Sequence, residues 1–167
     1  MFVASGSEQR TLEDEVVELL KEKCLKVTFA ESCTGGLLAG RLVNVSGASQ
    51  VFEEGFITYS NEVKERRIGV SADTLCTYGA VSKETAYEMA LGAAKTAKAD
   101  VGVSTTGIAG PCGGTKEKPV GLVYIGCSIK GTTKTKVFHF TGNRHDNREC
   151  TVIEALTFLK ECLLKWQ

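Results

Sequence analysis

The sequence has few of the residues that metal sites and disulfide frameworks require. It contains only two histidines, His139 and His145, and its seven cysteines include no C-x-x-C pair. We therefore expect no bound metal, and we expect the cysteines to be mostly reduced. Basic and acidic side chains number 20 each, so the net charge is zero. This balance predicts that the partner is neither nucleic acid nor an anionic membrane surface.

Long apolar runs are missing as well. No segment approaches the roughly 18 consecutive apolar residues that a membrane-spanning helix needs. The first ten residues, MFVASGSEQR, lack the cationic and apolar regions of a secretory signal. We therefore expect a cytoplasmic protein without membrane contact. The length of 167 residues, without a repeat or a linker, predicts a single domain over 1–167.

The first informative segment that is present is AESCTGG, residues 30–36, directly after the strand-like run 27–29. Gly35 and Gly36 let the backbone turn tightly, and the leucines after them predict a helix over 35–45. The order is strand, sharp turn and helix, which suits the presentation of a nucleophile. Free N–H groups at the start of the helix also favour developing negative charge.

Two hydroxyls and one thiol lie in this turn, on Ser32, Thr34 and Cys33. A hydroxyl in such a place either attacks a substrate or caps the helix that follows. A thiolate at a helix N-terminus is also reactive, so Cys33 is an alternative nucleophile. Because the sequence has no Cys–His pairing motif, Ser32 is the preferred candidate.

The second segment, FITYSNEVK at 56–64, again changes from a strand pattern to a helix pattern. We predict a strand over about 55–60, which places Tyr59 near its end, and a helix over 61–68 that carries Lys64. In an α/β sheet the carboxyl ends of the strands gather at one edge, where ligands bind. The alternatives are that Tyr59 is an ordinary strand residue and that Lys64 is a solvated surface charge.

The third segment, STTGIAGPCGGTKEKPVG at 104–121, holds both prolines of the chain. Its many glycines exclude regular structure, and a long irregular loop inside a compact domain is usually functional. The segment does not match a P-loop, because Gly-Lys-Ser/Thr is missing, and it contains no G-x-G-x-x-G. It is either a ligand-binding loop or a mobile surface loop.

The whole chain alternates between strand and helix patterns. Strands are predicted at 27–30, 55–60, 101–105, 121–129 and 134–140, the last two as a hairpin that turns at Lys130 and Gly131. Helices are predicted from Leu12 to Leu20, over 35–45 and 61–68, from Ser82 to about 98 with a narrow face of small residues, and over 144–165. A short turn or helix is predicted at 72–77. This pattern predicts an α/β fold with three α/β/α layers. The mixed sheet has about five strands and is mostly parallel, with one antiparallel strand.

The three segments, together with YGAVS at 78–82, closely resemble the CinA carboxy-terminal domain family. The resemblance extends from about residue 8 to the C-terminus and implies the CinA-like fold. Active members of the family are nicotinamide-nucleotide amidases, which convert nicotinamide mononucleotide to nicotinic acid mononucleotide and ammonia. Some relatives carry a further amino-terminal pyrophosphatase-like domain, which we expect to be absent here. The sequence departs from the common pattern at Tyr78, Cys112 and Asn143.

By motif, the resemblance places the catalytic serine, tyrosine and lysine of the family on Ser32, Tyr59 and Lys64. Ser32 attacks the amide carbonyl, and Lys64 is the base if its pKa falls from about 10.4 toward 7–8. Tyr59 relays the proton, or is itself the base. No cofactor is expected, the partner is a pyridine nucleotide, and a homo-oligomer is left open. The candidate substrate-binding residues are Thr34, Gly35, Gly36, Asn61, Thr106, Gly107, Gly110, Gly113 and Arg144.

Two further points stay open at the level of sequence. The oxyanion is stabilised either by N–H groups around Gly35 and Gly36 or by those around Thr106 and Gly107. The same pocket also suits a non-catalytic nucleotide-binding module, and a serine amidase for another small amide is a third interpretation. Lys64 separates catalysis from binding, because binding alone has no need for a buried amine beside a serine hydroxyl.

Overall fold

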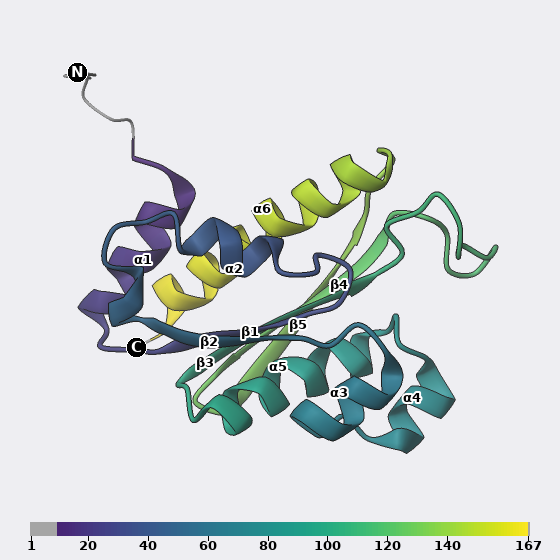
Figure 1. Ribbon diagram of the computed structural model, residues 1–167, viewed down its shortest axis with the longest axis horizontal. Coiled ribbons are helices and arrows are strands. Elements are labelled where there is room, and N and C mark those ends of the chain that lie inside the picture. Colours follow the sequence, from purple (N-terminus) through teal and green to yellow (C-terminus); the bar gives the residue numbers. More distant parts are fainter. Residues whose placement is uncertain (1–9, 167) are drawn as a thin grey trace.

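The computed structural model describes residues 10–166, which form a sheet between two layers of helices (Figure 1). In chain order the elements are α1 (Leu12–Glu22), β1 (Val27–Glu31), α2 (Leu37–Leu42), the 3₁₀ turn η1 (Ala48–Gln50), β2 (Phe52–Ile57), α3 (Asn61–Ile68), α4 (Ala72–Tyr78), α5 (Lys83–Ala97), β3 (Val101–Gly107), β4 (Leu122–Ile129), β5 (Thr132–His139) and α6 (Arg144–Lys165). Helices α1, α2 and α6 cover one face of the sheet, and α3, α4 and α5 cover the other.

The five strands have the order β2-β1-β3-β4-β5. β1 is parallel to both of its neighbours, β4 is antiparallel to β3, and β5 is antiparallel to β4. Only β4 therefore runs against the other four strands, which confirms the predicted mixed sheet. The hairpin turns at Lys130 and Gly131, whose φ angles of 46° and 86° are both positive, as a two-residue hairpin turn of this kind requires.

Two of the boundaries that differ from the sequence prediction affect the segments around Ser32 and Tyr59. β2 ends at Ile57 rather than near residue 60, because the Ser60 hydroxyl accepts a hydrogen bond from Val63 N and starts α3. Tyr59 is therefore in the strand-to-helix turn. The helix predicted over 35–45 covers only α2, since Gly35 and Gly36 have φ angles of 58° and 99° and belong to the turn.

The larger core lies between the sheet and α1, α2 and α6, and a smaller one lies under α3 and α5. As predicted, α5 turns a face of small residues to the sheet. The approach is close: a Cβ on Gly102 would lie 2.1 Å from Ala90 O, and one on Gly126 would lie 2.4 Å from Ala86 O. Glycine at both strand positions is therefore required for this packing.

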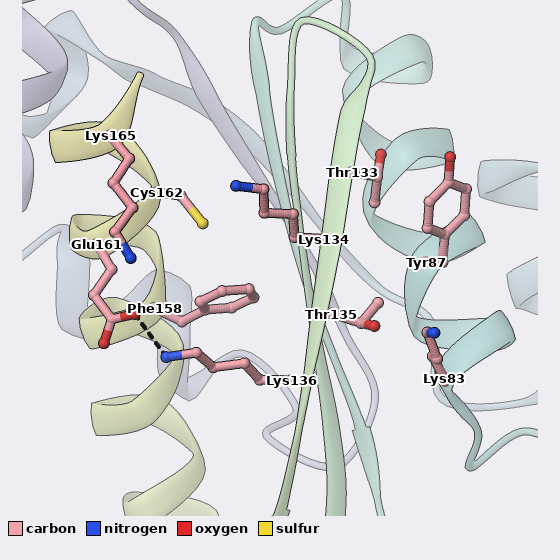
Figure 2. Close-up of a pocket in the computed structure, with 10 residues that line it drawn as sticks. All are labelled: Lys83, Tyr87, Thr133, Lys134, Thr135, Lys136, Phe158, Glu161, Cys162 and Lys165. Atoms are coloured by element: carbon pink, nitrogen blue, oxygen red, sulfur yellow. Dashed lines mark hydrogen bonds and ion pairs between the residues drawn. The ribbon is translucent and has the colours of Figure 1, made fainter. Parts of the chain in front are cut away.

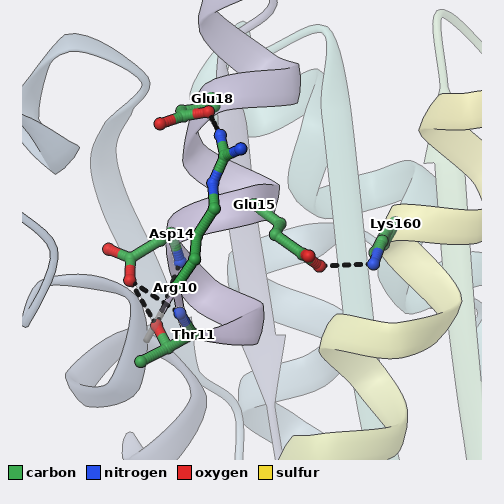
Figure 3. A network of polar contacts seen from close by, with 6 residues as sticks. All are labelled: Arg10, Thr11, Asp14, Glu15, Glu18 and Lys160. Carbon is green, nitrogen blue, oxygen red and sulfur yellow. Dashed lines mark hydrogen bonds and ion pairs between the residues drawn. The ribbon is translucent and has the colours of Figure 1, made fainter. Parts of the chain in front are cut away.

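One edge of the sheet is formed by β5. A groove runs along this edge, and side chains of α6, β5 and α5 line it (Figure 2). In the helical layer that also contains α6, α1 begins with a capping box between Thr11 and Asp14. Ion pairs Arg10–Glu18 and Glu15–Lys160 follow, and the second attaches α1 to α6 (Figure 3). Between residues 10 and 166, no helix combines the length and apolar character of a membrane span.

Candidate active site

The candidate site is built on a direct contact between Lys64 and Ser32. Lys64 Nζ lies 3.1 Å from Ser32 Oγ and also donates to the carbonyl oxygens of Thr58, at 2.7 Å, and Tyr59, at 3.3 Å. The lysine side chain is fully buried. A pocket of about 190 Å³ opens over the pair. The structure thus brings together the serine and the lysine that the sequence places 32 residues apart.

Burial of Lys64 follows from where α3 begins. The side chain is on the fourth residue of the helix, one turn after the Ser60 N-cap, so it lies next to the turn from β2. Its ammonium hydrogens are bound by two carbonyls and one hydroxyl, and no carboxylate is among these partners. Burial lowers the pKa of Lys64 from 10.5 to about 8. A substantial fraction of the amine is therefore neutral near neutral pH and can accept a proton.

The Ser32 turn is held from within by Glu31, the last residue of β1. Its buried carboxylate accepts hydrogen bonds from Gly36 N at 2.9 Å, Leu38 N at 3.0 Å and Ala39 N at 2.8 Å. These are N–H groups of the first turn of α2, which a carboxylate stabilises well. The N-terminus of α2 is therefore occupied by the protein itself, and these three N–H groups do not face a substrate.

The hydroxyl of Thr34 completes this network. It lies 2.6 Å from the Glu31 carboxylate and 2.8 Å from the hydroxyl of Thr105 on β3. Arg148 of α6 also binds this turn, because it donates to Cys33 O at 3.0 Å and to Thr34 O at 2.8 Å. Three elements thus fix the backbone on both sides of Ser32.

Cys33 lines the pocket next to Ser32, with only 7% of its surface exposed. Burial raises the pKa of its thiol to about 12. The thiolate is the nucleophilic form of cysteine, and it is scarce here at neutral pH. This argues against Cys33 as the nucleophile and for the neighbouring hydroxyl.

Tyr59 and Arg144 form the outer rim of the pocket. Tyr59 is 64% exposed, and its hydroxyl accepts a hydrogen bond from Arg144 at 3.4 Å. Arg144 also donates to Gly110 O at 2.8 Å, so it joins the glycine-rich loop to the first turn of α6. The phenol hydroxyl of Tyr59 thus contacts Arg144 and not Lys64. Lys64 instead donates to the main-chain oxygen of Tyr59.

The glycine-rich loop closes the opposite side. Thr106 and Gly107 at the end of β3 line the pocket, and the Thr106 hydroxyl donates to Ala80 O at 2.6 Å. Gly110 is buried with a φ of 89°, and a Cβ there would lie 2.6 Å from Val120 Cγ1. The two halves of the loop are therefore packed closely against each other at this residue.

A wider hollow of about 660 Å³ continues from this pocket. The two share Ala109 and Arg144 as lining residues. Arg148 and His145 add to its basic character, and Pro111 and Val120 give it an apolar side. Within the part of the chain that the structure describes, no group of three or more His, Cys, Asp or Glu side chains is arranged to hold a metal ion.

Comparison with known proteins shows the family of this chain. The family model of the CinA C-terminal domain matches residues 9–163. This chain belongs to the CinA family. A Clostridium novyi protein named for competence-damage induction is 59% identical over 155 residues, which are 93% of this chain and 37% of that protein. A CinA-like protein of Kosmotoga olearia is 52% identical over 159 residues, 95% of this chain and 39% of that protein. The chain thus spans less than half the length of these curated relatives.

Solved structures of CinA proteins have the same fold. A CinA superfamily protein from Klebsiella pneumoniae is 34% identical with a TM-score of 0.90, over 93% of this chain and 97% of that one. The competence/damage inducible protein CihA from Agrobacterium tumefaciens is 39% identical with a TM-score of 0.87, over 99% of this chain and all of that one. The predicted family and the predicted fold are thereby confirmed.

The three residues that depart from the CinA pattern do not line the pocket over Ser32. Asn143 is the N-cap of α6 and accepts from His145 N at 2.8 Å and Asp146 N at 3.1 Å. Asparagine is among the residues that cap helices best, so Asn143 holds the start of α6 in place. Cys112 is an exposed loop residue, and the carbonyl of exposed Tyr78 accepts from Lys118 Nζ at 2.6 Å.

The predicted site residues fall into two groups in this CinA-family structure. Those that line the pocket are Ser32, Tyr59, Lys64, Thr106, Gly107 and Arg144. Those that do not line it are Thr34, Gly35, Gly36, Asn61, Gly110 and Gly113. Thr34 and Gly36 hold the Ser32 turn through Glu31. Asn61 and Gly113 are exposed outside the pocket.

Sequence reasoning did not identify Glu31, Thr105 or Arg148. Glu31 lies inside the AESCTGG segment, and an acidic residue just before a helix indicates a carboxylate that binds the N–H groups of the first turn. Arg148 follows Arg144 by four residues, so the two lie on one helix face. Thr105 carried no such signal, because only the pairing of β1 with β3 places it beside Thr34.

Proposed function

We propose that this chain is a serine amidase that hydrolyses the carboxamide of a pyridine mononucleotide, giving the carboxylic acid and ammonia. The observation that carries the proposal is the 3.1 Å contact between Ser32 Oγ and the buried Lys64 Nζ at the floor of the pocket. Burial of an amine is costly, and a neutral amine beside a hydroxyl is what activates a serine nucleophile.

In the first step Ser32 Oγ attacks the amide carbon and Lys64 Nζ takes the hydroxyl proton. The lysine is competent for this because burial lowers its pKa to about 8. The ammonium so formed then gives its proton to the departing nitrogen, which leaves as ammonia. Water hydrolyses the acyl-enzyme with Lys64 again as the base.

The oxyanion needs donors that are free to face the substrate. Gly36, Leu38 and Ala39 are poor candidates, because their N–H groups are bound by Glu31. Of the two sets that the sequence left open, we therefore favour the backbone around Thr106 and Gly107, which line the pocket from β3, the neighbour of β1 on the side away from β2.

The two connected spaces suit the two halves of a mononucleotide. The pocket of about 190 Å³ over Ser32 is of the size for a carboxamide-bearing ring. The adjoining hollow presents Arg144, Arg148 and His145 to an anionic group. Tyr59, which contacts Arg144, is proposed to hold the substrate at the rim rather than to relay the proton. The choice of nicotinamide as the ring comes from the family resemblance.

The test is ammonia release by the purified protein from nicotinamide mononucleotide, its riboside and free nicotinamide. We expect turnover to be fastest with the mononucleotide, and Ser32→Ala to lower kcat by on the order of 10³-fold with little change in ligand affinity. Cys33→Ala is the matched control in the same turn and should keep most of the activity.

Two results would contradict the proposal. A larger loss in Cys33→Ala than in Ser32→Ala would transfer the nucleophile to the thiol. A wild-type protein that binds the mononucleotide in calorimetry yet releases ammonia from none of these amides would instead support the nucleotide-binding module.

A further inference from the structure

Cys127 and Cys162 form a pair of thiols away from the Ser32 pocket. Cys127 lies on β4 and is 1% exposed, whereas Cys162 is partly exposed in the last turns of α6. Both side chains belong to the same core, and the two thiols lie near enough for each to shift the pKa of the other. A buried thiol therefore has as its neighbour a thiol that solvent can reach.

The exposed member of the pair lines the groove along β5. Figure 2 shows Cys162 pointing from α6 into this space, with Lys134 on the facing strand. Lys134 is also the register partner of Cys127, so its side chain belongs to the same face of the sheet. The groove has a volume of about 530 Å³ and shares no lining residue with the Ser32 pocket.

The charges around Cys162 are mostly positive. Four lysines line the groove, and the acidic residue among the lining side chains, Glu161, is paired with Lys136 at 2.6 Å. The neighbouring Cys127 thiol and the charge of Lys134 lower the pKa of Cys162, against the opposing effects of burial and Glu161. The neighbouring Cys162 thiol and burial raise the pKa of Cys127.

We propose that Cys162 is a site of oxidation by hydroperoxides and that Cys127 is the thiol that resolves it into a disulfide. The Cys162 thiolate attacks one peroxide oxygen and breaks the O–O bond, giving a sulfenic acid and, for hydrogen peroxide, water after protonation. Cys127 then loses its proton, attacks the Cys162 sulfur and expels hydroxide, which leaves as water. Overall two thiols and one hydrogen peroxide give one disulfide and two waters.

Cys127 and Cys162 thus place an attacking and a resolving thiol in one core. Cys150 offers a matched control, because it is also half-buried on α6 but does not line the groove. Oxidation at Cys162 is independent of the proposed amidase activity, so the two proposals stand or fall separately.

The experiment treats the purified chain with hydrogen peroxide and maps its cysteines by mass spectrometry without reduction. We expect a Cys127–Cys162 cross-link in the wild type and in Cys150→Ser, and none in Cys162→Ser. In Cys127→Ser the sulfenic acid has no resolving thiol, so dimedone should label Cys162 about tenfold more than Cys150.

Oxidation that spreads over the exposed cysteines without this cross-link would overturn the proposal. So would equal dimedone labelling of Cys150 and Cys162 in Cys127→Ser. If Cys127→Ser does not fold, the reduced wild type decides: iodoacetamide must alkylate Cys162 about tenfold faster than Cys150 at neutral pH, and equal rates refute the assignment.

Discussion

The buried amine of Lys64 makes a prediction about stability that needs no substrate. The pKa of Lys64 is about 8 in the folded protein and 10.5 for the unperturbed side chain. Between these values the folded state binds fewer protons than the unfolded state, so the free energy of unfolding rises with pH. Lys64→Met removes the titrating group and fills the site with a flexible apolar side chain of similar length.

The size of the effect follows from the two pKa values. Their difference of about 2.5 pH units corresponds to about 3 kcal/mol in total, of which about 2 kcal/mol is regained between pH 7 and pH 9.5. Urea unfolding across this range should therefore show the wild type gaining about 2 kcal/mol relative to Lys64→Met. Cys33 titrates in the opposite sense, since its folded pKa is raised to about 12. It is present in both proteins, so its effect largely cancels in the comparison.

The same amine sets the pH dependence of the proposed reaction. With a pKa of about 8, about a tenth of Lys64 is neutral at pH 7 and half at pH 8, so kcat/KM should rise about fivefold over that interval. If the difference in the free energy of unfolding between wild type and Lys64→Met does not change with pH, the lowered pKa of the buried lysine is refuted. A flat rate profile in an active enzyme would refute its role as the base.

The remaining predictions concern the groups around this pair. Lys64→Arg keeps the charge but does not deprotonate in this range, so it should lose nearly all ammonia release; an active variant with the wild-type pH profile would contradict this. Glu31→Gln should lower the free energy of unfolding by about 2 kcal/mol in urea titrations, because one N–H of α2 then faces an amide donor. The control is Glu54→Gln at an exposed position. Equal stability of the two variants would refute the network. Gly110→Val should raise the KM for the mononucleotide more than for the riboside, since its side chain would collide with Val120 in the loop beside Arg144; equal effects on both substrates would assign the loop to the amide pocket.

Local signals in the sequence were enough for most of the architecture. The helical stripes and the hairpin at Lys130 and Gly131 each depend on residues that are neighbours in the chain. Boundaries were harder where two elements compete for the same residues. Ser60 fitted the alternation of a strand, yet its hydroxyl serves as a helix cap and thereby ends β2 early.

The candidate site was predictable as a set of segments but not as an arrangement. Ser32, Tyr59 and Lys64 stood out because each lies where a strand pattern changes to a helix pattern. Thr34 and Gly36 stood out for the same reason, but in the structure the Thr34 hydroxyl and the Gly36 N–H donate to the Glu31 carboxylate. Chain position alone does not tell a residue that faces a ligand from one that holds the turn, because the difference is a matter of side-chain direction.

The sequence by itself determined the alternation of strands and helices, the three-layer class and the family, since periodicity, caps and motifs are local properties. Tertiary structure decided which groups meet. The pairing of β1 with β2 and β3 brings Lys64 to Ser32 and Thr105 to Thr34. Burial then lowers the pKa of the lysine, an effect that exists only when distant segments together exclude water from the amine.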